Sequence, residues 1–132
     1  MIKFTDDLIV GVGNIDEQHK ELFERINAVS SLGAKSISKE ETDKTIKMLG
    51  DYIIKHFRDE EMLMQSRNYP KLDGHKQLHA QYIQSFNTLK VEYAANGPSA
   101  AFTLQLNKSI IEWIVKHIRS ADMDFSRFAK AK

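Results

Sequence analysis

One stretch of the chain, residues 46–63, combines the apolar spacing of a buried helix with two residue types that a hydrophobic core excludes. Its seam residues follow one another at steps of 3, 4, 3, 4 and 3: Ile46, Leu49, Ile53, His56, Glu60 and Leu63. This alternation predicts a helix that faces the core of a helical bundle. His56 and Glu60 stand about one turn apart on that face, where a buried carboxylate beside an imidazole needs a compensating partner. Either the two side chains pair with each other, or a cation lies between the helices.

Three other stretches repeat this spacing, so four amphipathic helices with short connections are expected. In chain order they are expected over about residues 17–32, from a Ser38–Glu41 capping box to about Met64 or Ser66, from Leu72 to about Asn96, and from Pro98 and Ser99 onward. Asp16 is the expected N-cap of the first helix, and Gly33 is expected to end it. The fourth seam is expected to hold Phe102, Leu106, Ile110, Trp113 and His117. Residues 1–14 show no helical period and form an expected N-terminal arm, while Phe125 and Phe128 indicate a short C-terminal helix or tail.

The predicted fold class is all-α: an antiparallel up-down-up-down four-helix bundle that forms a single domain over residues 1–132. In this topology the starts of the first and third helices meet the ends of the second and fourth. Every polar seam residue therefore falls in one layer near one end of the bundle. The residues of this layer are His19, His56, Glu60, His75, His79, His117 and Asp122.

These side chains include all five histidines of the chain, and the set suits a metal site better than a hydrogen-bonded core. Imidazoles and carboxylates without thiolates fit iron, manganese, zinc or copper. The ligating groups are too many for one ion. Two octahedral ions offer about twelve positions, of which five imidazoles, two bridging carboxylates and one bridging oxide or hydroxide fill about eleven. The position that is left has the size of a small diatomic ligand.

Composition excludes several other kinds of site and protein. The chain has 132 residues, no cysteine and a formal net charge of +1 with both signs interspersed. Disulfides and thiolate chemistry are therefore ruled out, and no nucleic-acid surface is expected. No apolar run approaches the roughly 20 residues of a membrane span. The acidic first residues lack the apolar core of a signal peptide, so a cytoplasmic protein without a membrane partner is expected.

The spacing of the seam residues resembles that of the hemerythrin family over essentially the whole chain. The family pattern is a histidine on the first helix, HxxxE on the second, HxxxH on the third and HxxxxD on the fourth. The matching stretches are residues 15–19, 56–61, 75–79 and 113–122, and the chain looks most like a stand-alone bacteriohemerythrin. One departure is Phe4, where such proteins often carry a tryptophan in the arm. This departure concerns the packing of the arm and leaves the ligand set complete.

The resemblance implies a non-haem di-iron centre that binds dioxygen reversibly. By this resemblance one iron takes His75, His79 and His117, the other takes His19 and His56 and keeps the open position, and Glu60 and Asp122 bridge both. The implied cofactor is two iron ions, Fe2+ or Fe3+, with a bridging oxo or hydroxo group.

Four apolar residues near the ligands are expected to form a dry wall beside the open position, an oxygen pocket made of Leu22, Phe57, Trp113 and Ile118. Glu61 is expected to be a solvated charge, because it turns roughly 100° away from the seam. On a regular helix, residues five apart such as His117 and Asp122 point about 140° apart. A widened turn or a helix end is therefore predicted between Ile118 and Asp122.

The predicted function is reversible dioxygen binding, for oxygen storage, transport and delivery, or sensing, rather than enzymatic turnover. An imidazole-rich site donates less charge than the carboxylate-rich sites of ferritin-like bundles, which favours binding over oxidation. Two rival functions stay open: a di-iron enzyme that handles peroxide, nitric oxide or nitrite, and a zinc-stabilised structural bundle. A reductase or an oxygen-consuming enzyme is the expected protein partner of the oxygen-binding protein or of the di-iron enzyme.

Overall fold

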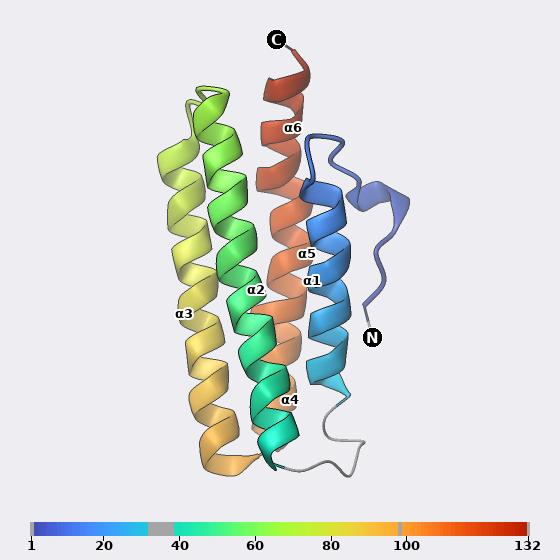
Figure 1. Cartoon of the computed structure of the whole chain (residues 1–132), viewed down its shortest axis with the longest axis vertical. Coiled ribbons are helices and arrows are strands. Elements are labelled where there is room, and N and C mark those ends of the chain that lie inside the picture. Colours follow the sequence, from blue (N-terminus) through green and yellow to red (C-terminus); the bar gives the residue numbers. More distant parts are fainter. Residues whose placement is uncertain (1, 32–38, 98, 132) are drawn as a thin grey trace.

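The computed structural model describes residues 2–31, 39–97 and 99–131, and within these ranges the chain is helical with no strand. The long helices are α1 (Ile15–Ser30), α2 (Lys39–Ser66) and α3 (Leu72–Asn96). A fourth helical run follows as α4 (Ala100–Gln105), η3 (Leu106–Glu112), α5 (Trp113–His117), η4 (Ile118–Asp122) and α6 (Met123–Lys130). The four rods lie side by side in alternating directions (Figure 1), which confirms the predicted all-α bundle with its short C-terminal helix.

The start of α1 differs from the prediction. The helix begins at Ile15 with Asn14 as its N-cap residue, so the prediction that Asp16 caps it is wrong. The Asp16 carboxylate instead accepts hydrogen bonds from the N–H of Val10 at 2.7 Å and of Gly11 at 2.9 Å. These amides belong to the N-terminal arm, which turns back over the start of the helix. Asp16 therefore fastens the arm to α1.

The other helix ends follow the sequence more closely. α2 and α3 end where they were predicted to end, and α1 ends at Ser30. Ser99 caps α4, because its hydroxyl accepts the N–H of Phe102 at 3.1 Å. The predicted stop at Gly33 and the predicted cap at Ser38 lie outside the described residues.

The fourth helical run contains two wide π-type segments, η3 and η4, and its buried residues show why. Seven of them recur at every fourth position: Phe102, Leu106, Ile110, Ile114, Ile118, Asp122 and Ser126. On a regular α-helix each four-residue step drifts by about 40°, so such a row would wind away from the core. The wider turns of η3 and η4 offset that drift and keep the row on one side.

η4 confirms the widened turn predicted between Ile118 and Asp122. The N–H of Met123 donates to the carbonyl of Ile118, five residues earlier, as in a π-helix. The wider turn brings Asp122 to the buried side that His117 already occupies, and only 1% of Asp122 is exposed.

η3 lies outside the sequence prediction and corrects the predicted seam of the fourth helix. Ile114 is fully buried, whereas Trp113, which was predicted to lie in the seam, is only partly buried. The wide turn explains the shift, because it makes Ile114 the residue that follows Ile110 on the core side. The buried Tyr82 hydroxyl donates to the Ile110 carbonyl at 3.0 Å and so satisfies a backbone acceptor within the wide turn.

The N-terminal arm and α6 pack against each other at one end of the bundle. Val10 in the arm is buried, and the hydroxyl of Ser126 in α6 donates to its carbonyl at 2.5 Å. A short 3-10 turn in the arm, η1 (Asp6–Leu8), meets η4 through an ion pair in which Arg119 donates twice to Asp7, at 2.7 and 3.0 Å. The arm therefore supports the same wide turn that carries Asp122.

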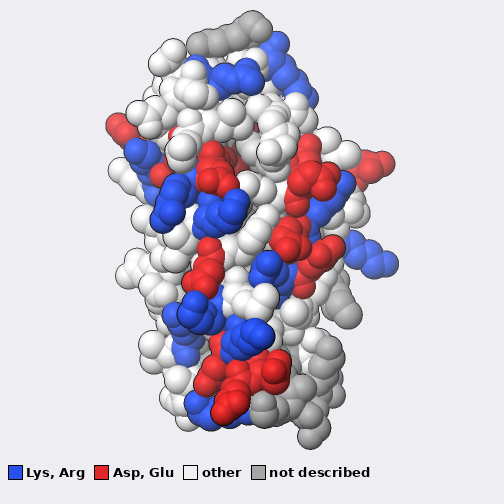
Figure 2. Space-filling view, in the orientation of Figure 1, with Lys and Arg blue, Asp and Glu red and all other residues white. Residues whose placement is uncertain are grey.

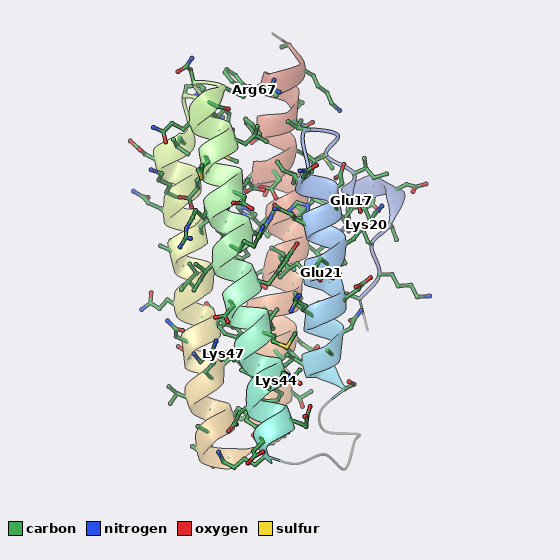
Figure 3. All side chains as sticks on the ribbon, viewed as in Figure 1. Glu17, Lys20, Glu21, Lys44, Lys47 and Arg67 are labelled. Atoms are coloured by element: carbon green, nitrogen blue, oxygen red, sulfur yellow. The ribbon has the colours of Figure 1, made fainter. Side chains whose placement is uncertain are left out.

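The face of the bundle shown in Figure 2 carries charges of both signs in close alternation. On α2 the exposed ion pairs one turn apart are Lys39–Asp43, Lys47–Asp51 and Lys55–Asp59, each at 2.8 Å. Glu17, Lys20 and Glu21 project from the outside of α1 (Figure 3). Among the described residues, none of the helices combines the length and the apolar character that crossing a membrane requires.

Candidate metal centre

The four helical rods bring all seven predicted ligands into one buried layer. His19 lies on α1, His56 and Glu60 on α2, His75 and His79 on α3, His117 on α5 and Asp122 at the end of η4. None of these residues is more than 5% exposed. Buried imidazoles and carboxylates at this density need hydrogen bonds to one another or a bound cation.

Glu60 lies at the middle of the layer, and its two oxygens face different histidines. Its Oε1 atom lies 2.8 Å from the Nε2 atom of His75 and 3.0 Å from that of His79. Its Oε2 atom lies 3.5 Å from the Nε2 atom of His56 and 3.8 Å from that of His19. Glu60 therefore extends one oxygen toward α3 and the other toward the contact of α1 with α2.

Asp122 divides its oxygens in the same way. Its Oδ1 atom lies 3.0 Å from the Nε2 atom of His75 and 3.2 Å from that of His117. Its Oδ2 atom lies 3.1 Å from the Nε2 atom of His19. The layer thus contains a three-histidine group (His75, His79 and His117) and a two-histidine group (His19 and His56), with both carboxylates between them. This is the arrangement that two neighbouring ions bridged by two carboxylates require.

Unpartnered atoms test whether these residues fit a metal. Buried side-chain atoms without a hydrogen-bond partner in the described chain include the Nε2 atoms of His19, His56 and His117, Oε2 of Glu60 and both carboxylate oxygens of Asp122. Each such buried atom costs about 1–3 kcal/mol when it is left unpaired. These six atoms are all potential metal ligands, and their residues belong to the two converging groups. The donor set therefore fits a pair of metal ions.

The electrostatics of the layer also favour a cation. Burial lowers the pKa of His56 to about 4, so its imidazole is neutral at neutral pH. Burial also opposes the charged form of His75, but the carboxylates of Asp122 and Glu60 outweigh it and raise the pKa of His75 to about 9. Despite its own burial, Asp122 has a pKa well below its usual range, because His117 and the other imidazoles surround it. The charged carboxylates therefore favour a cation in the layer. Protons and metal ions compete for the same imidazole nitrogens.

Glu61 has a role that the sequence did not predict. One of its carboxylate oxygens lies 2.7 Å from the Nδ1 atom of His79, and 25% of its side chain is exposed. The prediction of a merely solvated charge is therefore wrong. A hydrogen bond at Nδ1 fixes the orientation of the His79 ring, whose Nε2 atom lies 3.0 Å from Glu60.

His56 has a different outer partner, Gln18, which the sequence pattern did not predict either. The Oε1 atom of Gln18 lies 2.8 Å from the Nδ1 atom of His56. The amide of Gln18 donates to Asp59 at 2.9 Å, and Lys55 donates to the same Asp59 oxygen at 2.8 Å. Gln18 and Glu61 each directly adjoin a predicted ligand in the sequence, and that adjacency is the signal that could have indicated them.

The four predicted pocket residues differ in burial: three are buried and one is partly exposed. Leu22 and Ile118 are fully buried, and Phe57 is 2% exposed. The Phe57 ring stacks on His79 with centroids 3.8 Å apart and planes at 2°, so it lies against the three-histidine group. Trp113 is partly buried and stacks on His117 at 4.7 Å and 13°, and it also lines an open groove beside that imidazole. Three of the four residues are therefore interior, whereas Trp113 covers the three-histidine group, although the open position was expected at the two-histidine group.

A second groove reaches the layer from the arm. It has a volume of about 270 Å³ and is lined by residues of the arm, α1 and α2 that include Gly13, Gln18, Asp59 and Glu60. Glu60 itself is only 1% exposed. The groove thus comes within one side chain of the two-histidine group, because Gln18, which lines it, contacts His56.

Comparisons with known proteins agree with this geometry. Residues 10–129 match the model of the hemerythrin HHE cation binding domain. The chain is 32% identical over 111 residues to a myohemerythrin of Theromyzon tessulatum, which covers 84% of this chain and 79% of that protein. It is 27% identical over 131 residues to a bacteriohemerythrin of Stenotrophomonas maltophilia, which covers 99% of this chain and 83% of that protein. A crystal structure of wild-type hemerythrin shares the fold with a TM-score of 0.82 and 25% identity, over 96% of both chains. The chain therefore belongs to the hemerythrin family.

Proposed function

We propose that this chain holds two iron ions and binds dioxygen reversibly, in oxygen storage, delivery or sensing. The proposed ligands are His19, His56, Glu60, His75, His79, His117 and Asp122. The observation that carries the proposal is the division of both carboxylates between the two histidine groups. One ion alone would leave one group of imidazoles and one oxygen of each carboxylate buried without a partner.

The proposed iron pair, when bound, supplies an open coordination position and the electrons that dioxygen takes up. The residues of the chain hold and shield that pair. Glu60 and Asp122 supply the buried negative charge that two cations require. Burial keeps His56 neutral, so its nitrogen is ready to act as a ligand without first losing a proton.

The apolar residues around the centre have the proposed role of excluding water. Leu22 and Ile118 are fully buried and offer no hydrogen-bonding group to a water molecule. Phe57 covers one face of His79, and Trp113 covers one face of His117. These side chains would keep water and protons away from the metal pair, and this favours reversible binding over irreversible oxidation of the site.

A di-iron redox enzyme for peroxide, nitric oxide or nitrite is the second candidate function. The groove of about 270 Å³ that leads to Glu60 favours it, because small substrates could reach the two-histidine group from solvent. A zinc-stabilised structural bundle is the weakest candidate, since a structural zinc site needs only four ligands.

The visible spectrum of the iron-loaded protein tests the function. The protein is reduced without air, exposed to oxygen and then purged with inert gas. Reversible binding predicts a charge-transfer band that appears with oxygen and disappears when oxygen is removed, over repeated cycles. Irreversible oxidation in the first cycle, or steady consumption of peroxide or nitric oxide with a reductant present, would favour the enzyme instead.

Iron content tests the ligand assignment separately. His56→Ala removes one proposed ligand of the two-histidine group, so we expect less than two irons per chain and a lower unfolding temperature. Lys47→Ala is the control, because Lys47 is exposed on α2 and faces away from the layer. Two irons per chain in His56→Ala would contradict the assignment.

A further inference from the structure

The two histidine groups differ in what supports them from outside. In the three-histidine group, the Nδ1 atom of His79 lies 2.7 Å from a carboxylate oxygen of Glu61. In the two-histidine group, the Nδ1 atom of His56 lies 2.8 Å from the neutral amide oxygen of Gln18. The Nδ1 atom of His19 is buried and has no partner among the described residues. Only the three-histidine group thus has an anionic outer partner in these contacts.

This difference changes how strongly each group donates to a metal. A carboxylate that accepts the Nδ1 proton makes the imidazole more basic at Nε2, whereas a neutral amide mainly fixes the orientation of the ring. The effect of Glu61 is partly screened, because 25% of its side chain is exposed. It still acts at the ring that Phe57 holds rigidly by stacking at 3.8 Å.

The number of converging ligands points in the same direction. Ligand atoms of Glu60, His75, His79, His117 and Asp122 lie within 4.8 Å of one another. The corresponding set on the other side contains His19, His56 and Glu60. A metal ion in the first set has more protein ligands, one of which is strengthened from outside.

We infer that Glu61 and Gln18 are positioning residues that make the two metal positions unequal, so that a divalent metal ion loads first at the three-histidine group and is held there more tightly. The inference rests on the proposed two-metal site and adds an order of loading and its cause. The half-loaded protein then carries its ion at the three-histidine group. The two-histidine group fills second, and Gln18 orients His56 there through its bond to Asp59.

Titration of the metal-free protein with cobalt(II) under inert gas tests this order, because the visible absorption of cobalt reports its coordination at each step. A competing chelator gives the affinity of each step. We expect two separate steps. Glu61→Gln keeps an acceptor for the Nδ1 proton of His79 but removes the charge, and it should weaken the tighter step by about 10-fold while leaving the other unchanged.

Gln18→Leu should give the opposite pattern. It removes the acceptor beside His56 with little change in side-chain volume, so the weaker step should lose about 10-fold in affinity and the tighter step should be unchanged. Glu17→Gln and Gln65→Leu are matched controls at exposed positions on α1 and α2, and neither should change either step. Glu17 projects outward from α1 (Figure 3), and its ion pair is with Lys20.

Three results would overturn the inference. They are a single phase with two equal sites in the parent protein, a loss at the weaker step in Glu61→Gln, and unchanged affinities in both variants. Two irons per chain and a reversible oxygen band would still support the proposed function in each case. A parent protein that binds no second metal would instead remove the proposed function, and the inference with it.

Discussion

Removal of the metal ions is the perturbation that should change the folded state most. The seven residues of the layer are at most 5% exposed, so they cannot turn to water without opening the bundle. Three imidazole Nε2 atoms and three carboxylate oxygens that could bind metal have no hydrogen-bond partner within the described protein. In the proposed metal-loaded protein, metal–ligand bonds would satisfy these atoms. In the metal-free protein they have no hydrogen-bond partner, and only the surrounding imidazoles offset the cost of burying Glu60 and Asp122 beside each other.

The loss in the free energy of unfolding on metal removal follows from the number of unpartnered atoms. At the lower end of the range, about 1 kcal/mol for each atom, the six atoms cost about 6 kcal/mol. Natural domains have a total free energy of unfolding of about 5–15 kcal/mol, so the loss is comparable with the whole. For a chain of this length, 1 kcal/mol corresponds to roughly 3–5 °C in the unfolding temperature. We therefore expect the metal-free protein to unfold roughly 20 °C below the loaded protein.

Thermal unfolding of both forms measures this difference. Far-UV circular dichroism follows the helices, and the fluorescence of Trp113, the single tryptophan, follows the ring stacked on His117. Hydrogen exchange should show that the amides around η4 lose protection first. Unfolding temperatures within a few degrees of each other would refute the reasoning, because the unpartnered atoms would then cost the folded state very little.

Three further predictions concern the wall, the core and the pH dependence. Leu22→Ser should still bind two irons, but its oxygenated form should oxidise to the ferric state faster than that of the parent, and the rate should rise more steeply as pH falls. Leu89→Ser is the control, because Leu89 is equally buried on α3 and lies far from the layer residues in sequence. Equal oxidation rates in the two variants would contradict the proposed wall. Gly50→Ala should lower the free energy of unfolding by about 1–3 kcal/mol in urea, because its new Cβ would lie 2.6 Å from the Phe86 ring, whereas Gly74→Ala has open space and should gain about 1 kcal/mol. In the metal-free protein the raised pKa of His75 contributes to the free energy of unfolding fully below about pH 6.5, and this contribution is lost as pH rises through about 9. The loss is about 3 kcal/mol at most, and urea unfolding at the two pH values measures it.

The helices and the seven layer residues could be predicted from the sequence because both depend on a period. Seams such as Ile46 to Leu63 repeat at the spacing of a regular helix, so the buried face and its odd residues are visible without coordinates. His56 and Glu60 are detectable for the same reason, since a polar residue in an apolar seam breaks an otherwise regular pattern. The antiparallel topology then brings the ends of the helices together.

The features that escaped prediction depend on contacts between chemically ordinary residues. Asp16 has the residue type and sequence position of an N-cap, but its carboxylate accepts hydrogen bonds from the arm, at the amides of Val10 and Gly11. Glu61 and Gln18 are polar residues at the edge of a seam, as solvated residues are. Only the spacing between α2 and α3, and between α1 and α2, shows that these two side chains reach a histidine.

In the fourth helix, one wide turn could be predicted from the sequence and the other could not. The HxxxxD spacing of His117 and Asp122 already requires a wide turn, and η4 supplies it. A single wide turn, however, would leave the upstream residues in the phase of a regular helix, with Trp113 in the seam. The row from Phe102 to Ser126 at steps of four extends the mismatch over the whole helix, so a second wide segment is needed before the site. η3 fulfils that need, and it moves Trp113 out of the core and onto the outer side of His117. The burial of Asp122 and the position of the Trp113 ring on His117 therefore both depend on one pattern, the four-residue repeat of the fourth helix.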